Sequence, residues 1–339
     1  MKNKIHNYDF LVVGAGLIGS LAAITLLKNK YKVLVIDKNS QILNDNRTLA
    51  VNANSKDFLK KLGIWNKLKT NPEAINKIEI NDSINRSPLI FENSKEEMGS
   101  VIFNKDLLLE VKQSLIKKNL LIEGINIEIS KIKPNKEIKI KYKNYIFKQI
   151  LLCLGKNYNN NATIKRFSFP SNHKSYVGFF NHSIAHNQTA YETFTTDGPL
   201  AVLPAPSRLK KTSTFIYSTS NQVTNFNIHK LIKKYFSKSH GLINFKKDIY
   251  QYKILPHLSR DKFNQYILIG DILRSIHPVA GQGWNLGIRD IQTFINLLNH
   301  YDIDDPNLID KYYSNRSIEG FTYLTFTSLI NKIYENQKE

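Results

Sequence analysis

The stretch GDILRSIHPVAGQGWNLGIRD, from Gly270 to Asp290, decides the fold. It follows the apolar run 266–269, which is typical of a buried strand, and leads into a helical pattern from Leu286. Two glycines, Gly281 and Gly283, stand just before that helix. Glycines let the backbone approach a ligand closely, and the first N–H groups of a helix have no partner within it. The stretch therefore predicts either an anion-binding helix start or a plain strand–loop–helix joint.

A second glycine turn lies near the N-terminus, between two strand-like runs. Its parts in order are a strand at 8–13, the glycines Gly14, Gly16 and Gly19, a helix at 20–29, a strand at 32–36, and Asp37. The acid follows the last glycine by 18 residues, near the spacing at which such units bind a ribose. Residues 10–27 carry no charge, but the glycines favour a strand and buried helix over a membrane span. This βαβ unit predicts a dinucleotide site, for FAD or NAD.

Length and composition limit the remaining possibilities. A chain of 339 residues can bury a large core, and we expect two domains. Cys153 is the only cysteine, which excludes an internal disulfide and a cysteine-built metal site and fits a reducing compartment. The net charge is +20, spread over scattered lysines. That spread argues against nucleic acid and leaves an anionic membrane surface or an ordinary solvated surface.

The stretch 270–290 resembles the second flavin fingerprint of the class A flavoprotein aromatic hydroxylases. Within them it is most similar to the ubiquinone-biosynthesis hydroxylases, whose loop is rich in HP-x-AGQG-x-NLG. The resemblance implies that Asp271 contacts the FAD ribityl and pyrophosphate. It implies that the following turn lays backbone amides against the flavin ring, through Ala280, Gly281, Gln282, Gly283 and Asn285. The family usually has Ala-Ala after Gly-Asp, whereas this chain has Ile272-Leu273-Arg274, which leaves the side chains near the pyrophosphate open.

Two further motifs extend the resemblance. The run RTLAVNANSKDFLKKLGIW at 47–65 is similar to a family segment and implies that Arg47 lies beside FAD. An exposed arginine before a capped helix is the alternative. The run TFTTDGPLAVLPAP at 193–206 resembles F-T-x-x-GPLA-x-LP. It implies that Gly198, Pro199 and Leu200 lie near the substrate and flavin, although the same residues also predict a local β-turn.

One segment departs from the family. Relatives carry Ala-Asp-Gly where this chain has Cys153-Leu154-Gly155. In the family that aspartate touches both FAD and NAD(P)H, so Leu154 weakens the expectation of efficient nicotinamide use.

The resemblance implies an α/β fold. We expect a FAD-binding Rossmann-like domain of the glutathione-reductase type, interwoven with a smaller mixed-sheet substrate domain, as in p-hydroxybenzoate hydroxylase. The FAD-binding domain is expected to be discontinuous, over 1–70, 98–166 and 256–339. The substrate domain is expected at 71–97 and 167–255.

The implied function is an FAD-dependent monooxygenase. NAD(P)H reduces FAD, O₂ adds to it, and the flavin hydroperoxide hydroxylates an aromatic ring, here a polyprenyl-phenol of ubiquinone biosynthesis. No metal and no catalytic triad are expected, and His277 is either a proton relay, a flavin neighbour or structural. A prenylated aromatic substrate implies a cytoplasmic protein at the inner face of the membrane, with other ubiquinone-biosynthesis proteins as possible partners.

Two alternatives stay open at this point. One is another flavin oxidoreductase of the same fold, such as an epoxidase, halogenase or reductase. The other is a non-catalytic member that binds FAD or a prenyl lipid and serves as an assembly subunit, which Leu154 favours.

Overall fold

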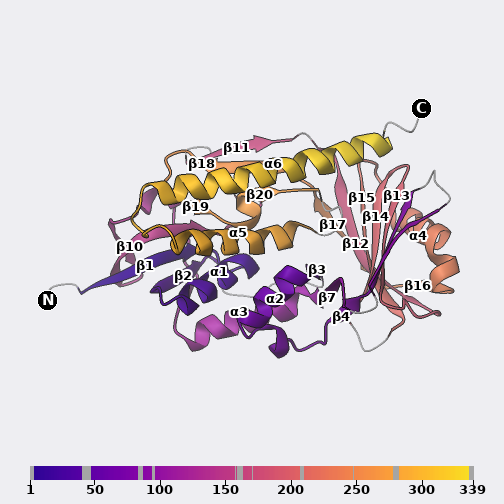
Figure 1. Cartoon of the computed structure of the whole chain (residues 1–339), viewed down its shortest axis with the longest axis horizontal. Helices are drawn as coiled ribbons and strands as arrows, with labels where there is room; N and C mark the ends of the chain where they lie inside the picture. The colour runs from indigo at the N-terminus through magenta and orange to yellow at the C-terminus, as the bar shows by residue number, and fades with distance from the viewer. Residues whose placement is uncertain are drawn as a thin grey trace.

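The computed structural model describes residues 4–39, 47–82, 87–93, 96–156, 158, 163–169, 171–206, 210–246, 248–277 and 282–335. It shows an elongated molecule, with a parallel sheet towards one end and a large, mostly antiparallel sheet at the other (Figure 1). The long helix α6 (Asn307–Glu335) runs along the molecule from the first sheet towards the second.

The parallel sheet has the strand order β19-β10-β1-β2-β8. Its strands are β1 (Ile5–Val13), β2 (Val33–Asp37), β8 (Leu121–Glu123), β10 (Lys143–Leu152) and β19 (Ile267–Leu268), and β9 (Glu137–Ile140) adds to β10 in the antiparallel sense. The central strands β1 and β10 pair in register from Ile5↔Asn144 to Val13↔Leu152. Their apolar runs are buried without alternation, as expected for a parallel sheet covered on both faces. The predicted α/β fold with a βαβ unit is confirmed.

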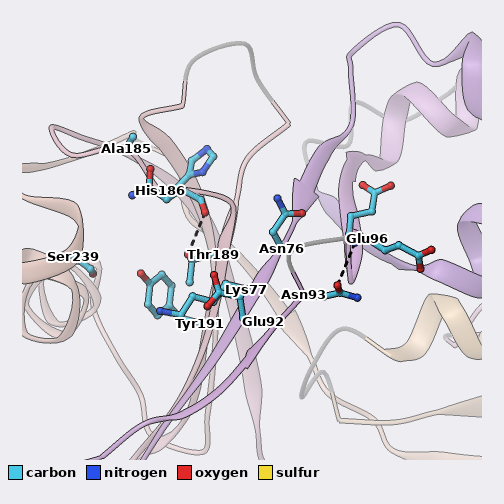
Figure 2. A pocket seen from close by; sticks show the side chains of 12 residues that line it. Asn76, Lys77, Glu92, Asn93, Glu96, Ala185, His186, Thr189, Tyr191 and Ser239 are labelled. Carbon is cyan, nitrogen blue, oxygen red and sulfur yellow. Dashed lines mark hydrogen bonds between the residues drawn. The ribbon is translucent and has the colours of Figure 1, made fainter.

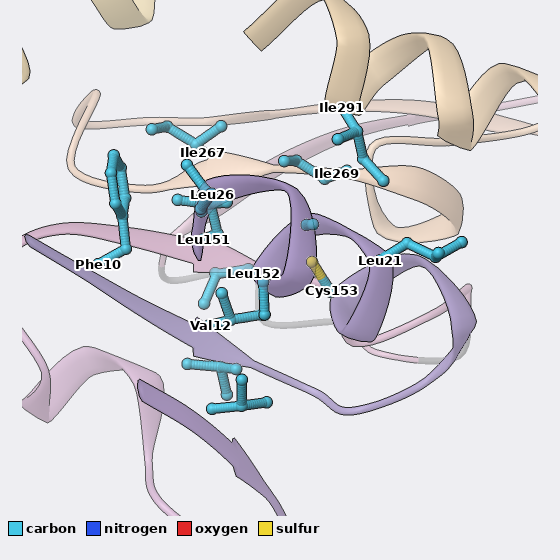
Figure 3. Close-up of a cluster of buried hydrophobic side chains, with 14 of the residues drawn as sticks. Phe10, Val12, Leu21, Leu26, Leu151, Leu152, Cys153, Ile267, Ile269 and Ile291 are labelled. Carbon is cyan, nitrogen blue, oxygen red and sulfur yellow. The ribbon is translucent and has the colours of Figure 1, made fainter. Parts of the chain in front are cut away.

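Helices pack around this sheet to form the main core. They are α1 (Leu17–Lys28), α2 (Ala53–Lys61), α3 (Asn104–Lys117) and α5 (Gln282–Leu298), with short 3₁₀ turns at η1 (Trp65–Lys67), η2 (Ile129–Lys131) and η3 (Gly270–Ile272). Helix α1 is buried from Gly19 to Leu26, which explains its uncharged sequence. Figure 3 shows side chains of β1, α1, β10 and α5 meeting in this core, with the free thiol of Cys153 among them.

The large sheet has the order β16-β12-β15-β14-β13-β5-β6. Its strands are β5 (Lys77–Asp82), β6 (Leu89–Glu92), β12 (Lys174–His182), β13 (Thr189–Thr195), β14 (Gly198–Pro204), β15 (Thr212–Thr219) and β16 (Ile243–Phe245), and β17 (Tyr250–Lys253) pairs with β12. Helix α4 (Asn225–His240) covers one face, where it buries Ile228, Ile232 and Phe236 against the sheet. The opposite face is free to contribute to a cavity.

Two three-stranded sheets complete the fold. One joins β3 (Thr48–Asn52), β7 (Gly99–Phe103) and β4 (Glu73–Ile75). The other joins β11 (Ile164–Ser168), β18 (His257–Asp261) and β20 (Arg274–Ser275). Among the residues described, no helix combines the length and the apolar character that crossing a membrane requires.

Candidate functional site

A cavity of about 540 Å³ opens at the carboxyl ends of the parallel strands. This edge of an open α/β sheet is where such folds bind their ligands. Gly16 lines it from the β1–α1 turn and Gly283 lines it from the start of α5. Leu203 of β14 and Ile216 of β15 line it from the large sheet. The two glycine turns predicted to bind one cofactor therefore face a single space that also reaches the second sheet.

Three glycines shape the β1–α1 turn in different ways. Gly14 has a φ of +104°, and a Cβ there would lie 2.5 Å from the Cys153 carbonyl oxygen. A Cβ at Gly19 would lie 1.9 Å from the Gly14 carbonyl oxygen. A Cβ at Gly16 would meet nothing within 4 Å. Packing thus requires the first and third glycines, whereas the second leaves open space for a ligand over the start of α1.

Asp37 stabilises the β1–α1 turn. Its carboxylate accepts a hydrogen bond from the Ala15 backbone N–H at 2.5 Å, and it also lines the cavity. The acid predicted to contact a ribose therefore stands at the end of β2, beside the turn. The other oxygen accepts a hydrogen bond from the Asn39 backbone N–H at 2.7 Å, and each oxygen keeps a second lone pair that a hydroxyl donor could use.

Three charged side chains lie together further along the cavity: Arg47, Lys156 and Asp271. Arg47 stacks over the Tyr252 ring of β17, 5.2 Å from its centroid. Asp271 can be reached by water through the cavity although protein atoms surround it. Desolvation raises the pKa of Asp271, and the nearby Lys156 and Arg47 oppose that shift. Sequence reasoning predicted Arg47 and Asp271 and missed Lys156, which follows Leu154 by two residues.

The Gly-Asp turn is fixed from behind by a buried ion network. Asp290 accepts hydrogen bonds from the Gly270 N–H at 2.9 Å, from Arg274 at 2.5 Å and from Arg316 at 2.8 Å. Asp290 is fully buried, and both arginines are at most 5% exposed. Arg274 therefore points into the protein and not towards a pyrophosphate. This settles the question that the unusual Ile272-Leu273-Arg274 run left open, because all three residues are buried.

The second glycine turn is described only in part. Ala280 and Gly281 lie outside the described residues, and Gln282 begins α5. Asn285 is 3% exposed and does not line the cavity. Its amide donates to the Ala50 carbonyl at 2.9 Å and accepts from the Asn52 N–H at 3.3 Å. The side chain thus holds β3 against the start of α5, and a contact between Asn285 and the cofactor stays a prediction.

His277 lies outside the cavity lining. Its Nε2 is 3.2 Å from Nδ1 of His173, and the two rings meet edge to face. Burial, and next the neighbouring His173, lower the pKa of His277 to about 3. His277 is therefore neutral at ordinary pH and links its loop to the segment before β12. This geometry supports the structural role among the three that the sequence left open.

The strand β14 presents Leu203 to the cavity, whereas Leu200, expected near the substrate and flavin, is fully buried. Successive side chains alternate between the two faces of a strand. Leu200 therefore packs with Phe236 of α4 in the core of the large sheet. Gly198 closes the β13–β14 turn with a φ of +133°, and a Cβ there would lie 2.0 Å from the Ser218 carbonyl oxygen. Neither Gly198 nor the adjacent Pro199 lines the cavity.

Two donors in the cavity wall have no hydrogen-bond partner among the described residues. They are the indole Nε1 of Trp284 and the hydroxyl of Thr48. Buried donors are rarely left unpaired, so each is suited to a ligand. Together with the open backbone at Gly16 and Gly283 and the two cations, they fit a long ligand with a phosphate group and a polar ring. FAD has that chemistry.

A second cavity, of about 590 Å³, lies at the large sheet, between the β5–β6 hairpin and the segment 185–189 (Figure 2). Its lining is polar, with Glu92, Glu96 and Lys77 among the contributors, and it includes none of the predicted site residues. Within the described ranges no three His, Cys, Asp or Glu side chains are arranged to hold a metal ion. The first cavity is therefore the candidate site.

Comparison with known proteins agrees with this geometry. Residues 7–121 match the family model described as FAD binding domain. A probable FAD-dependent monooxygenase of Pseudomonas aeruginosa, PqsL, has the same fold, with a TM-score of 0.74 over 98% of both chains at 12% identity. The fold is thus shared with solved FAD-dependent monooxygenases.

Sequence comparison finds relatives named as ubiquinone biosynthesis enzymes. The chain is 24% identical to the mitochondrial ubiquinone biosynthesis monooxygenase COQ6 of Caenorhabditis elegans, over 98% of this chain and 90% of that protein. It is 31% identical to the 3-demethoxyubiquinol 3-hydroxylase of Escherichia coli over 130 residues, which is 32% of this chain and 29% of that enzyme. The chain is thus similar along nearly its whole length to a ubiquinone biosynthesis monooxygenase.

Proposed function

We propose that this protein is an FAD-dependent monooxygenase that hydroxylates the aromatic ring of a polyprenyl-phenol in ubiquinone biosynthesis. One observation carries the proposal: a single cavity connects the glycine turn of β1–α1, the start of α5, and apolar side chains of the large sheet. The first two features suit a flavin dinucleotide, and the third suits an apolar ring beside it.

The cofactor would lie along the strand ends. The turn Gly14–Gly19 and the start of α1 would hold the pyrophosphate, since a helix start favours negative charge. Asp37 would bind the adenosine ribose. Arg47 and Asp271 would bind the pyrophosphate and ribityl region. Bound FAD would supply electron transfer from NAD(P)H and oxygen activation, which no side chain can supply.

The flavin ring would lie towards α5. The backbone N–H groups of Gln282, Gly283 and Trp284 are at the first turn of that helix. They have no partner within the helix, so they can stabilise negative charge on a reduced ring without any acidic side chain. Exclusion of water by the surrounding apolar wall strengthens this interaction.

The substrate would enter from the side of the large sheet. Leu203, Ile216 and Ile276 give that wall an apolar character. An aromatic ring placed there would be held by shape and by apolar contact, with the Trp284 N–H available to an oxygen substituent. We propose on this basis that 71–97 and 167–255 form the substrate domain, and that 1–70, 98–166 and 256–339 form the FAD-binding domain.

The position of Leu154 bears on the nicotinamide. Leu154 packs against the main core and does not line the cavity, whereas its neighbours Cys153 and Gly155 do. A non-catalytic, FAD-binding assembly subunit is therefore the second candidate function. Stopped-flow mixing of the flavin-loaded protein with NADPH separates the two, because an assembly subunit would keep its flavin oxidised.

We also propose that the protein works at the inner face of the membrane. Helix α6 exposes the apolar side chains Ile318, Phe321, Phe326 and Leu329, and the net charge of +20 would attract anionic lipid. Flotation with phosphatidylglycerol vesicles tests this, with phosphatidylcholine vesicles as the control. Equal recovery with the two vesicle types, or no recovery with either, would contradict this proposal.

The main test is direct. The purified protein is reconstituted with FAD and incubated with NADPH, O₂ and a polyprenylphenol, and the product is analysed by mass spectrometry. We expect a product that has gained one oxygen atom. Failure to take up FAD at all would overturn the proposal. The variant Asp271→Ala should lose FAD on gel filtration, and full flavin occupancy in that variant would refute the role of Asp271.

A further inference from the structure

We propose that Lys156 is a phosphate-binding residue of the cavity, and that its ammonium group contacts the pyrophosphate of a dinucleotide. The inference rests on the proposed function in one respect, that the cavity holds such a ligand. Two dinucleotides share this chemistry, FAD and NAD(P)H, and the experiment below separates them.

The place of Lys156 in the fold supports this role. It follows β10, which lies in the sheet between β1 and β19. The Cys153 N–H donates to the Val13 carbonyl at 2.8 Å, so the segment after β10 is held against the end of β1. The same segment touches the glycine turn, where the Cys153 carbonyl excludes a side chain at Gly14. The segment that carries Lys156 therefore begins against the turn at which α1 starts, and Lys156 and Gly16 line the same cavity.

The backbone turns over open space just before Lys156. Gly155 has a φ of +74°, and a Cβ at that position would meet no atom within 4 Å. Both Gly155 and Lys156 line the cavity. The chain thus brings the lysine to the cavity wall through a conformation that glycine adopts readily.

The ammonium group retains donors for a ligand. Nζ of Lys156 donates one hydrogen bond, of 3.1 Å, to the backbone carbonyl of Lys253 in β17. An ammonium group carries three N–H donors. One donor is used in this contact, and two remain on a side chain that lines the cavity.

The charges around Lys156 explain why a cation is needed there. Asp271 suits the hydroxyl groups of a ribityl chain, but its carboxylate repels a nearby pyrophosphate. Lys156 and Arg47 both lie close enough to Asp271 to influence its ionisation. Burial lowers the pKa of Lys156 and Asp271 opposes that shift, which places the two groups in one electrostatic environment. A lysine on a flexible stem offsets this repulsion as a point charge.

The experiment compares three variants: Lys156→Met, Lys156→Arg and the matched control Lys253→Met. The control removes the exposed side chain of Lys253 but keeps its backbone carbonyl, which accepts the hydrogen bond from Lys156. FAD affinity is measured by flavin fluorescence at several salt concentrations, and ligand-free melting temperature is measured in parallel. Affinity for NADP⁺ is then measured with the FAD site saturated.

We expect Lys156→Met to weaken binding of one dinucleotide about tenfold, because a charge-assisted hydrogen bond is lost. The salt dependence of that binding should also become shallower, because one ion contact is missing. Lys156→Arg should restore most of the affinity, and Lys253→Met should leave it unchanged. A change confined to FAD assigns the flavin pyrophosphate, and a change confined to NADP⁺ assigns the nicotinamide dinucleotide.

Two outcomes would overturn the proposal. One is unchanged affinity and salt dependence for both dinucleotides in Lys156→Met. The other is a lower melting temperature of the ligand-free protein together with weaker binding that Lys156→Arg does not restore. That second result would show that Lys156 only stabilises β17. If the protein does not hydroxylate the substrate but its dinucleotide binding still depends on Lys156, this inference holds and the proposed function fails. The two failures are therefore distinguishable.

Discussion

The carboxylate of Asp290 accepts a hydrogen bond from the backbone N–H of Gly270, 2.9 Å away and 20 residues earlier in the chain. The same carboxylate is paired with the guanidinium groups of Arg274 and Arg316. Helices α5 and α6 are thereby tied to the turn that presents Asp271 to the cavity. The position of a cavity residue thus depends on charges that no ligand touches.

Replacement of Asp290 by Asn should destabilise the protein by about 3–5 kcal/mol, because buried Arg274 would lose its counter-ion and Arg316 would keep only Glu319. Urea unfolding of the ligand-free protein measures this. The matched control is Asp310→Asn, which removes an exposed pair with Arg260 and should cost no more than ~1 kcal/mol. Equal losses in the two variants would show that the buried network has no special importance.

Substitutions in the first glycine turn should separate folding from binding. Gly16 has φ −68° and open space around it, so Gly16→Ala should fold normally and lose most of its FAD affinity. Gly19→Ala should fail to reach a stable fold, because its Cβ would overlap the Gly14 carbonyl. Circular dichroism melting and flavin fluorescence measure the two effects. Normal FAD binding by Gly16→Ala would contradict the assigned cofactor position.

Leu200 and Leu203 lie on opposite faces of β14 and should respond differently to truncation. Leu200→Ala should cost about 2–5 kcal/mol in unfolding free energy, because it leaves a hole under α4. Leu203→Ala should cost less, because its side chain faces the cavity, and it should raise the KM for the aromatic substrate. The opposite pattern in unfolding and kinetics would reverse the assignment of the two faces.

Stability should fall in acid because of buried histidines near the second cavity. His182, His186 and His240 are each at most 5% exposed, and the rings of His182 and His240 are 4.6 Å apart. Burial is the main cause that lowers the pKa of His186 to about 4 and that of His240 to about 3. Their folded-state pKa values lie below the ordinary 6.5. The stabilisation is therefore complete above pH 6.5 and declines as the pH falls towards those values.

The variant His240→Phe tests that contribution. It should remove up to ~1.4 kcal/mol per pH unit from the acid-side slope of the unfolding free energy between pH 6 and pH 4. Phenylalanine is a reasonable replacement because His240 already packs against Phe180 and Phe236. A slope identical to that of the wild type would show that acid lability has another source, such as the carboxylates.

The sequence predicted the features that depend on local chain geometry. The turn at Gly14–Gly19, the strand before it, and the helix and strand after it are confirmed, because the local residue pattern indicates each of them. Contacts between distant residues were not predictable in this way. Asn285 bonds to Ala50, 235 residues away, and nothing in the local sequence indicated this contact.

The orientation of β14 is likewise set by distant residues. Alternation along β14 was visible in the sequence, but which face meets the cavity depends on where α4 packs. One signal for the ion network was available and was missed. Asp290 is a charged residue among the buried apolar positions Leu286, Ile291 and Phe294 of α5. A buried carboxylate needs a cationic or hydrogen-bonding partner.

The three adjacent strands β19, β10 and β1 come from widely separated parts of the chain, and β1 is made first. During synthesis β1 cannot pair with β10 until residues 143–152 have been made. The strand ends that line the cavity are complete only after residues 267–268 have left the ribosome. Folding rates fall with such sequence separation. A dinucleotide can therefore bind in the complete cavity only after residues 267–268 have emerged, and unpaired strand edges before that moment favour aggregation.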